Sequence, residues 1–241
     1  MNGYYPELDE IKEIIKNAEH AVFFGGAGVS TESGIPDFRS SGGLYDTNES
    51  GEYFLSRECL LCEPERFFDF FRENMVFDGY EPDGAHAALA SLERDGVIKA
   101  VITQNIDGLH QAAGSRRVIE LHGRSGRFYC TKCHAEYGND VLWGGGVPRC
   151  EHCGGIVRPD VTLYGESLDG FSFSDAEDEI SRADVLIVGG TSLLVNPAAS
   201  LIDAYQGEHL IIVNYAQTPY DEYAEYLIRE SISEVLSYIA E

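Results

Sequence analysis

The chain of 241 residues is 44% hydrophobic and 24% charged. This composition is typical of a globular protein with a sizeable core, and it excludes collagen-like, disordered and coiled-coil chains. Forty-one acidic against 17 basic residues give a formal net charge of −24. Such a surface repels nucleic-acid phosphates and anionic lipids, so we expect neither nucleic acid nor a membrane as a partner and favour basic peptides.

Two further features bear on localisation and size. No apolar run approaches the roughly 18 residues needed to cross a bilayer. The first twenty residues carry Glu7, Asp9, Glu10 and Glu13, where a signal peptide would have an uninterrupted apolar stretch. We therefore expect a cytoplasmic protein. At about 150 residues per domain, the length predicts one main domain with a smaller insertion. Separately, we expect the protein to be a monomer.

In chain order, apolar side chains first recur at helical spacing over residues 7–18 and then form an apolar run at 21–24. Further apolar runs lie at 98–102, 185–188 and 210–213. Segments with helical character lie near 84–95, 197–205 and 220–239. Strands that alternate with helices predict an α/β fold with a parallel sheet covered on both faces.

Two stretches interrupt this alternation and read as insertions into the α/β core. Residues 40–82 are rich in Gly, Ser, aromatic and acidic residues. Residues 124–158 hold four of the six cysteines. The second stretch has few apolar residues of its own to bury, so a bound metal would supply much of its folding free energy.

All six cysteines fall in C-x-x-C pairs. Sixteen residues separate the pair Cys130/Cys133 from the pair Cys150/Cys153, a spacing typical of a four-thiolate zinc ribbon. A redox-active dithiol is the alternative. The remaining pair, Cys59 and Cys62, encloses two leucines, so we expect both thiols to join an apolar core as small hydrophobic groups.

A glycine-rich turn, residues 25–30, follows the first predicted strand. It would let the backbone approach a pyrophosphate, but a tight turn alone also explains it. The third glycine of the usual dinucleotide fingerprint is missing, which argues against a hydride-transferring dehydrogenase. The next loop, residues 33–39, could clamp a cofactor, with Arg39 facing phosphate and Phe38 shielding a reactive centre. Its alternative is a surface pair between Arg39 and Asp37.

Polar residues follow several predicted strands directly. Residues 103–107 come after the strand at 98–102, residues 189–192 after that at 185–188, and Asn214 after that at 210–213. In open α/β sheets, ligands bind at the carboxyl ends of the strands. Asp107 could instead cap a helix. His122 could be a general base, although a lone histidine is often structural.

Taken in order, these motifs resemble the sirtuin family of NAD-dependent protein lysine deacylases. They are GAGVS at 26–30, GIPDFR at 34–39, TQNID at 103–107, LHG at 121–123, YGE at 164–166 and GTS at 190–192, with the two zinc-type cysteine pairs before YGE. The resemblance implies one catalytic domain over 1–241. Its parts would be a Rossmann-like core (1–39, 83–123 and 159–241), a flexible loop with a helical module (40–82) and a zinc-ribbon module (124–158).

The resemblance also implies roles for single residues. The cofactor NAD would be bound by Ala27, Gly28, Thr31, Phe38, Arg39, Gln104, Asn105, Ile106, Asp107, Gly190, Thr191, Ser192, Asn214 and the backbone near Ile232. His122 would contact the cofactor and act as the base, and Asn105 and Asp107 would complete the catalytic set. Cys130, Cys133, Cys150 and Cys153 would hold one structural zinc ion.

An acyl-lysine peptide would pair with two segments, represented by Thr162, Leu163, Tyr164 and Gly165 and by Leu193 and Val195. Such strand addition draws affinity from the backbone. Relatives that remove dicarboxylic acyl groups carry a Tyr and an Arg three residues apart, and the matching segment here, residues 70–74, lacks that pair. Acetyl or longer neutral acyl groups are therefore favoured, unless Arg72 reaches the acyl tunnel.

Three positions depart from the family pattern: Gly25 for a hydroxyl residue, Tyr164 for Phe and Thr162 for Val. None removes a catalytic group. Two other functions stay open, namely protein mono-ADP-ribosyl transfer from the same NAD site and a non-catalytic NAD or ADP-ribose sensor. The presence of His122, Asn105 and Asp107 favours deacylation.

Overall fold

The computed structural model describes residues 6–38, 43–47 and 51–241. Its larger part is a six-stranded sheet with the order β3-β2-β1-β7-β8-β9. Every neighbouring pair is parallel. The strands are β1 (Ala21–Gly25), β2 (Ile98–Thr103), β3 (Val118–Glu120), β7 (Val185–Gly189), β8 (His209–Val213) and β9 (Tyr226–Ile228).

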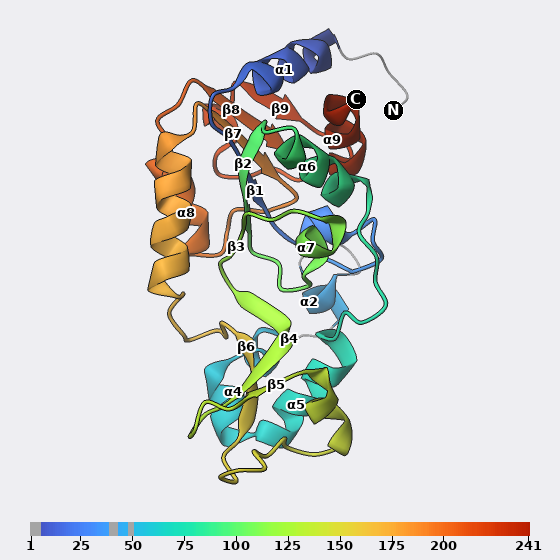
Figure 1. Cartoon of the computed structure of the whole chain (residues 1–241), viewed down its shortest axis with the longest axis vertical. Coiled ribbons are helices and arrows are strands. Elements are labelled where there is room, and N and C mark those ends of the chain that lie inside the picture. Colours follow the sequence, from blue (N-terminus) through green and yellow to red (C-terminus); the bar gives the residue numbers. More distant parts are fainter. Residues whose placement is uncertain (1–5, 39–42, 48–50) are drawn as a thin grey trace.

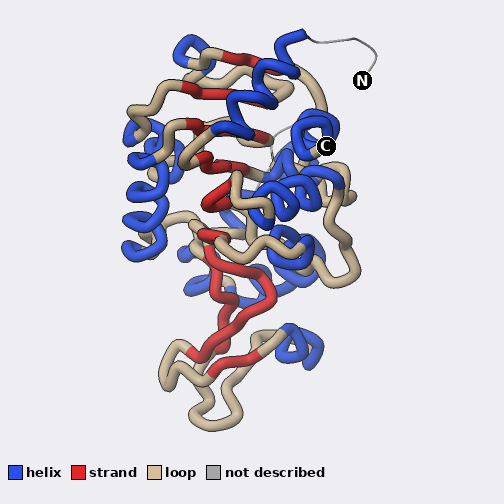
Figure 2. The backbone as a smooth tube through the Cα atoms, turned by 45° about the horizontal axis from the view of Figure 1, so that its top comes forward, coloured by secondary structure: helices blue, strands red, loops and turns tan. Residues whose placement is uncertain are grey.

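Helices cover both faces of this sheet (Figures 1 and 2). Alternate residues of the central strands point to opposite sides, so Phe23 joins one apolar cluster and Val22 and Phe24 join the other. The first cluster is closed by α1 (Pro6–Asn17), α6 (Gly84–Arg94) and α9 (Ile232–Ala240). The second is closed by α8 (Gly170–Arg182) and the 3-10 helix η3 (Ala198–Ala204). The predicted parallel sheet with helices on both faces is confirmed.

The smaller part holds a three-stranded antiparallel sheet with the order β5-β4-β6, below the large sheet in Figure 1. Its strands are β4 (Gly123–Cys130), β5 (Glu136–Tyr137) and β6 (Val157–Val161), and the 3-10 helix η2 (Asn139–Gly144) carries Trp143, the one tryptophan of the chain.

Four short helices pack beside this sheet: α2 (Leu44–Thr47), α3 (Gly51–Phe54), α4 (Arg57–Cys62) and α5 (Pro64–Asn74). Phe67, Phe68 and Phe71 of α5 share one apolar cluster with Phe128 of β4. Apolar packing therefore joins the helices to the three-stranded sheet as far as the buried cysteines Cys130 and Cys150. The boundaries given above for the parts of the chain stay a prediction.

The C-terminal region differs from the sequence expectation. Residues 220–239 are not one helix, because the 3-10 turn η4 (Asp221–Tyr223) and strand β9 precede α9. Ile211, Ile212 and Val213 of β8 pair with β9, whose β-branched and aromatic residues suit an edge strand. One other short helix, α7 (Leu109–Ala113), follows β2. No helix in the described ranges is long and apolar enough to cross a membrane.

Candidate functional site

A cavity of about 790 Å³ lies at the carboxyl ends of β1, β2, β7 and β8 and extends to the end of β6. It gathers nearly all of the residues that the sequence singled out. They are Ala27, Gly28, Thr31, Phe38, Gln104, Asn105, Ile106, Asp107, His122, Thr162, Leu163, Tyr164, Gly165, Gly190, Thr191, Ser192, Val195, Asn214 and Ile232.

Two of the selected residues are not in this set. Arg39 lies outside the described residues. Its two expected roles, contact with the cofactor and pairing with Asp37, therefore stay predictions. Leu193 does not line the cavity, because its side chain packs into the apolar cluster under α8. Its neighbour Leu194 lines the cavity instead and is 59% exposed.

The turns after β1 and β7 touch each other at the floor of the cavity. The amide of Gly28 donates to the carbonyl of Gly190 over 2.8 Å. A Cβ on Gly28 would lie 2.7 Å from the Cα of Gly190, closer than real Cβ contacts. Gly28 is therefore required by the packing of two turns, and it lies within a short 3-10 helix, η1 (Ala27–Ser30).

A hydrogen-bonded network orders the polar side chains after β2. Ser30 Oγ donates to Asp107 Oδ2 over 2.7 Å and accepts from Asn105 Nδ2 over 3.0 Å. Gln104 Nε2 donates to Thr191 Oγ1 over 2.9 Å, which joins the ends of β2 and β7. Asp107 Oδ1 also accepts from the amide of Leu109, the first residue of α7, although the N-cap position itself is Gly108. Ser30 is the last residue of the GAGVS motif, but no sequence pattern predicts its hydrogen bonds to Asn105 and Asp107.

His122 lies between β3 and β4 and also lines the cavity. Its Nδ1 is 2.9 Å from the carbonyl oxygen of Gln104. A carbonyl only accepts, so Nδ1 carries the proton and Nε2 is left as a basic nitrogen. Burial lowers the pKa of His122, while the bond to Gln104 opposes this shift. A neutral imidazole with a fixed tautomer is the form that accepts a proton.

Residues 161–166 form the opposite wall of the cavity. A bidentate ion pair between Arg158 and Glu166 holds this segment. Arg158 Nη1 and Nη2 donate to the two carboxylate oxygens of Glu166 over 2.5 and 2.9 Å. Glu166 Oε2 also accepts from the amide of Leu163 over 3.0 Å. Arg158 is 8% exposed, so this pair is largely removed from solvent and fixes the shape of the segment. No pattern in the sequence predicts that Arg158 is the partner of Glu166.

Tyr164 is bound to the helices by its main chain. Its amide donates to the carbonyl of Leu55 over 3.0 Å, and its carbonyl accepts from the amide of Arg57 over 2.9 Å. Leu163 and Gly165 line the cavity. Both backbone groups of Leu163 are bonded to Glu166, because its amide donates to Oε2 and its carbonyl accepts from the Glu166 amide over 2.9 Å.

The segment Phe70–Asn74 lies at the end of α5. Phe71 and Asn74 line the cavity, whereas Arg72 is directed elsewhere. Arg72 Nε donates to the carbonyl of Leu142 over 2.8 Å, and its Nη2 donates to the carbonyl of Gly146. Arg72 is thus held by the loop around η2 and does not line the cavity. It is therefore not available to bind a dicarboxylic acyl group there.

The charged residues that line the cavity within the described ranges are all acidic, apart from titratable His122. They are Glu32, Asp37, Asp107, Glu166 and Glu230. A region with one sign of charge raises the local concentration of oppositely charged ligands. Any anionic ligand in the described part of the site would depend on backbone amides of the glycine turns instead of Lys or Arg side chains.

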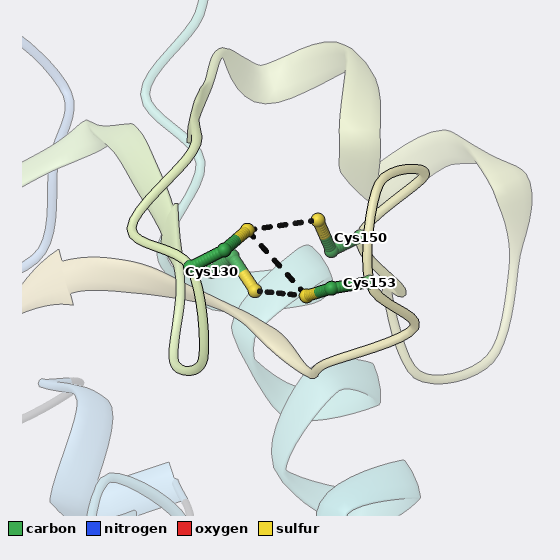
Figure 3. A group of neighbouring side chains, drawn as sticks. Cys130, Cys150 and Cys153 are labelled. Carbon is green, nitrogen blue, oxygen red and sulfur yellow. Dashed lines mark hydrogen bonds between the residues drawn. The ribbon is translucent and has the colours of Figure 1, made fainter.

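The two cysteine pairs converge at the outer end of the three-stranded sheet. Their four sulfur atoms all lie within 4.8 Å of one another. Cys130 and Cys153 are 3.4 Å apart and Cys133 and Cys150 are 3.5 Å apart (Figure 3). Zinc–sulfur bonds of about 2.3 Å give tetrahedral edges of roughly 3.8 Å, so these four residues fit a zinc ion. Four thiolates leave no open position for a reacting ligand, so the ion would be structural.

The third pair behaves differently at its two positions. Cys59 is fully buried in the cluster around the phenylalanines of α5, as expected. Cys62 is exposed, so the expectation was wrong for this residue. It is the last residue of α4, where the chain leaves the apolar contact.

Comparison with known proteins identifies the family to which the chain is similar. Residues 26–197 match the Sir2 family. An "NAD-dependent protein deacetylase" of Clostridium perfringens is 48% identical over 95% of this chain and 97% of its own length. One of Clostridium tetani is 50% identical over 96% of each chain.

Solved structures agree with these relatives. The structure "Sir2-p53 peptide-NAD+" superposes with a TM-score of 0.86 at 39% identity and covers 95% of both chains. A complex with a propionylated peptide gives the same TM-score, 0.86, at 38% identity over 95% of both chains. A family match over most of the chain and relatives of near 50% identity lead to one conclusion: the chain belongs to the Sir2 family, the sirtuins.

Proposed function

We propose that the chain is an NAD-dependent protein lysine deacylase that removes an acetyl or other neutral acyl group from lysine. One water molecule would be consumed when the lysine is released, and the products would be nicotinamide, O-acyl-ADP-ribose and the free lysine. One observation supports this proposal most directly. A single cavity brings the neutral base His122 together with the amide and carboxylate side chains after β2 and with the strand edge at residues 162–165.

The residues on the sheet side suit the two halves of NAD. The turns at Ala27–Thr31 and Gly190–Ser192 would receive the diphosphate and adenosine, with Asn214 and the backbone of Ile232 beside them. Gln104, Asn105, Ile106 and Asp107 would hold the nicotinamide and its ribose, since amide and carboxylate groups bind carboxamide and hydroxyl groups. Phe38 would shield the reacting centre from water.

The chemistry needs no Ser or Cys nucleophile. When NAD is bound, it supplies a cationic leaving group, and the acyl oxygen of the substrate is the attacking atom. The protein therefore contributes position, exclusion of water and a base. His122 would accept the proton of a ribose hydroxyl at Nε2, with Nδ1 held by Gln104. Asn105 and Asp107 are themselves fixed by Ser30.

The peptide would add as a strand between residues 162–165 and residues 193–196. Both backbone groups of Tyr164 are already bonded to Leu55 and Arg57. Both backbone groups of Leu163 are bonded to Glu166, so the carbonyl of Thr162 and the backbone of Gly165 would pair with the peptide on this side. Recognition through the backbone leaves few side-chain requirements on the peptide sequence.

We also propose that the peptides are basic. The acidic residues lining the cavity support this preference. An electrostatic contribution to binding weakens as salt screens the charges. The KM for a Lys- and Arg-rich acetyl-peptide should therefore rise with salt, while that for a neutral peptide should change little. A salt-independent KM for the basic peptide would refute this preference.

The acyl preference rests on Phe71 and Asn74. Neither provides the charged fork that an Arg makes with a dicarboxylic acyl group, and Arg72 is held by the loop around η2. Acetyl- and propionyl-lysine peptides should therefore react faster than a succinyl-lysine peptide of the same sequence. The reverse order would refute this assignment.

The central test follows peptide mass and released nicotinamide together, with and without NAD. We expect NAD-dependent loss of the acetyl group with matched release of nicotinamide. His122→Ala should lower kcat by about 10²- to 10⁴-fold, the usual contribution of a general base, and should keep NAD binding. Nicotinamide release without deacylation would favour ADP-ribosyl transfer, and the absence of both products would favour a sensor.

A further inference from the structure

A hydrogen bond between two tyrosines connects the segment after Phe38 with the peptide-binding segment. The hydroxyl groups of Tyr45, on α2, and Tyr164, in the peptide-binding segment, are 2.8 Å apart. Their ring centroids are 6.5 Å apart at an interplanar angle of 55°. Both residues line the cavity. Tyr164 is also a position at which the chain departs from the phenylalanine usual in the family.

Tyr45 is attached to the loop that carries Phe38. The amide of Leu44 donates to the carbonyl of Asp37 over 2.8 Å, and the amide of Tyr45 donates to that of Phe38 over 2.9 Å. The rings of Phe38 and Tyr45 pack with centroids 5.3 Å apart. The position of Tyr45 therefore restrains the position of Phe38 through both backbone hydrogen bonds and ring packing.

Tyr164 is attached to the peptide edge. Its backbone is pinned between Leu55 and Arg57, and its neighbours Leu163 and Gly165 face the cavity. In the free protein its side chain is partly open to water, with 36% of the residue exposed. A peptide strand laid along this edge would cover the ring and remove competing water, which strengthens a hydrogen bond.

We propose that Tyr45 and Tyr164 are positioning residues that couple peptide binding to NAD binding. The peptide would fix Tyr164, the shared hydrogen bond would fix Tyr45, and Tyr45 would hold Phe38 over the nicotinamide end of the site. The proposal rests on the function proposed above. Coupling between two ligands is reciprocal, so NAD would tighten the peptide by the same factor.

The test is equilibrium binding of a carbocyclic NAD analogue that cannot react, measured by calorimetry with and without saturating acetyl-lysine peptide. The ratio of the two dissociation constants is the coupling factor. A neutral hydrogen bond of ordinary strength corresponds to about fivefold in an equilibrium constant. Tyr45→Phe and Tyr164→Phe should each reduce the coupling factor by about that amount, and the double variant should reduce it no further.

Non-additivity separates this link from two independent packing effects. Tyr223→Phe is the matched control, because Tyr223 is an exposed tyrosine on η4 outside the cavity, and it should keep the wild-type coupling factor. An unchanged factor in Tyr164→Phe, or additive losses in the double variant, would overturn the proposal. Failure of the wild-type protein to bind the peptide or deacetylate it would instead count against the proposed function.

Discussion

The two sheets of this molecule are stabilised by different means. In the large sheet, all residues of β1 and β7 are buried, and each buried Val, Leu, Ile or Phe side chain contributes about 1.5–3 kcal/mol. In the small sheet, β5 has two residues and only part of β4 is buried. This sheet depends on the four cysteines at its outer end, on the apolar cluster that joins Phe128 to α5, and on the Arg158–Glu166 pair.

This difference separates the two sides of the cavity. Apolar burial shapes the cofactor side before any ligand binds, so its polar groups are held in place by rigid strands. The peptide side has an apolar cluster of its own, but it also depends on the Arg158–Glu166 pair and on a metal site. We therefore expect perturbations of zinc or of charge to act on the peptide side first, and perturbations of buried groups in the large sheet to act on the global stability.

The largest effect is expected for Cys150→Ser. A structural zinc site supplies roughly 10–16 kcal/mol of apparent binding free energy in small zinc modules. The variant should lose its zinc, as measured by metal analysis, and amide-exchange protection around β5 and η2 should disappear. Protection in β1 and β7 should persist.

Cys62→Ser is the control for this experiment, because Cys62 is exposed and lies outside the four-sulfur cluster. It should keep the zinc content of the wild-type protein. Equal loss of protection in both sheets of Cys150→Ser would show that the two parts fold as one unit.

A smaller effect is expected for Glu166→Gln, which leaves Arg158 without its counter-ion. Charged hydrogen bonds of this kind contribute about 2 kcal/mol. Burial raises the pKa of Glu166, but the bonds from Arg158 and Leu163 outweigh this effect and lower it overall. The stabilisation should therefore be full above the unfolded-state pKa and should be lost as the pH falls through the folded-state pKa.

Kinetics gives the readout for this variant. Because the carboxylate shapes residues 161–166, Glu166→Gln should raise the KM for peptide much more than the KM for NAD. Equal increases in the two KM values would contradict the division between the two sides of the cavity.

The smallest effect concerns His110, which is buried under the large sheet between Phe23 and His86. Burial, followed by the charge of His86, lowers the pKa of His110 to about 3. Between pH 6.5 and that value the unfolded chain binds a proton that the folded chain does not. Stability should fall by about 1.4 kcal/mol per pH unit from this group as the pH decreases.

His110→Leu removes this contribution. The free energy of unfolding, measured by urea denaturation at pH 6.5, 6.0 and 5.5, should therefore decrease less steeply with acidification in the variant than in the wild-type protein. Identical slopes would show that His110 takes up its proton equally in both states.

Local patterns were sufficient for β1, β2, β7 and β8 of the large sheet, though not for the short edge strands β3 and β9, and for the zinc ligands, because apolar runs and C-x-x-C spacing are encoded within short windows. They also placed polar residues at the carboxyl ends of strands, where the topology of a parallel sheet brings them together. They failed at residues 220–228, where pairing with β8 overrides helical periodicity. Leu193 was misplaced because its backbone, with φ of 53°, turns the side chain into the core.

Pairs of distant side chains could not be predicted in this way. Tyr45 and Tyr164 are 119 positions apart, and no periodicity relates them. Arg158 and Glu166 are closer in sequence, but a charged pair at that spacing has no signature of its own. These contacts depend on how the helices after residue 43 pack against β6, which only the folded chain defines.

Trp143 lies in η2, which follows β5 in the chain and is bonded to α5 through Arg72 and the carbonyl of Leu142. Since it is the single tryptophan of the chain, tryptophan fluorescence monitors η2 and its surroundings, whereas far-ultraviolet circular dichroism reports on the helices of the whole molecule. The two methods therefore report on different parts of the molecule. Two unfolding transitions recorded by these methods need not coincide, and the interval between them would measure how strongly the halves cooperate.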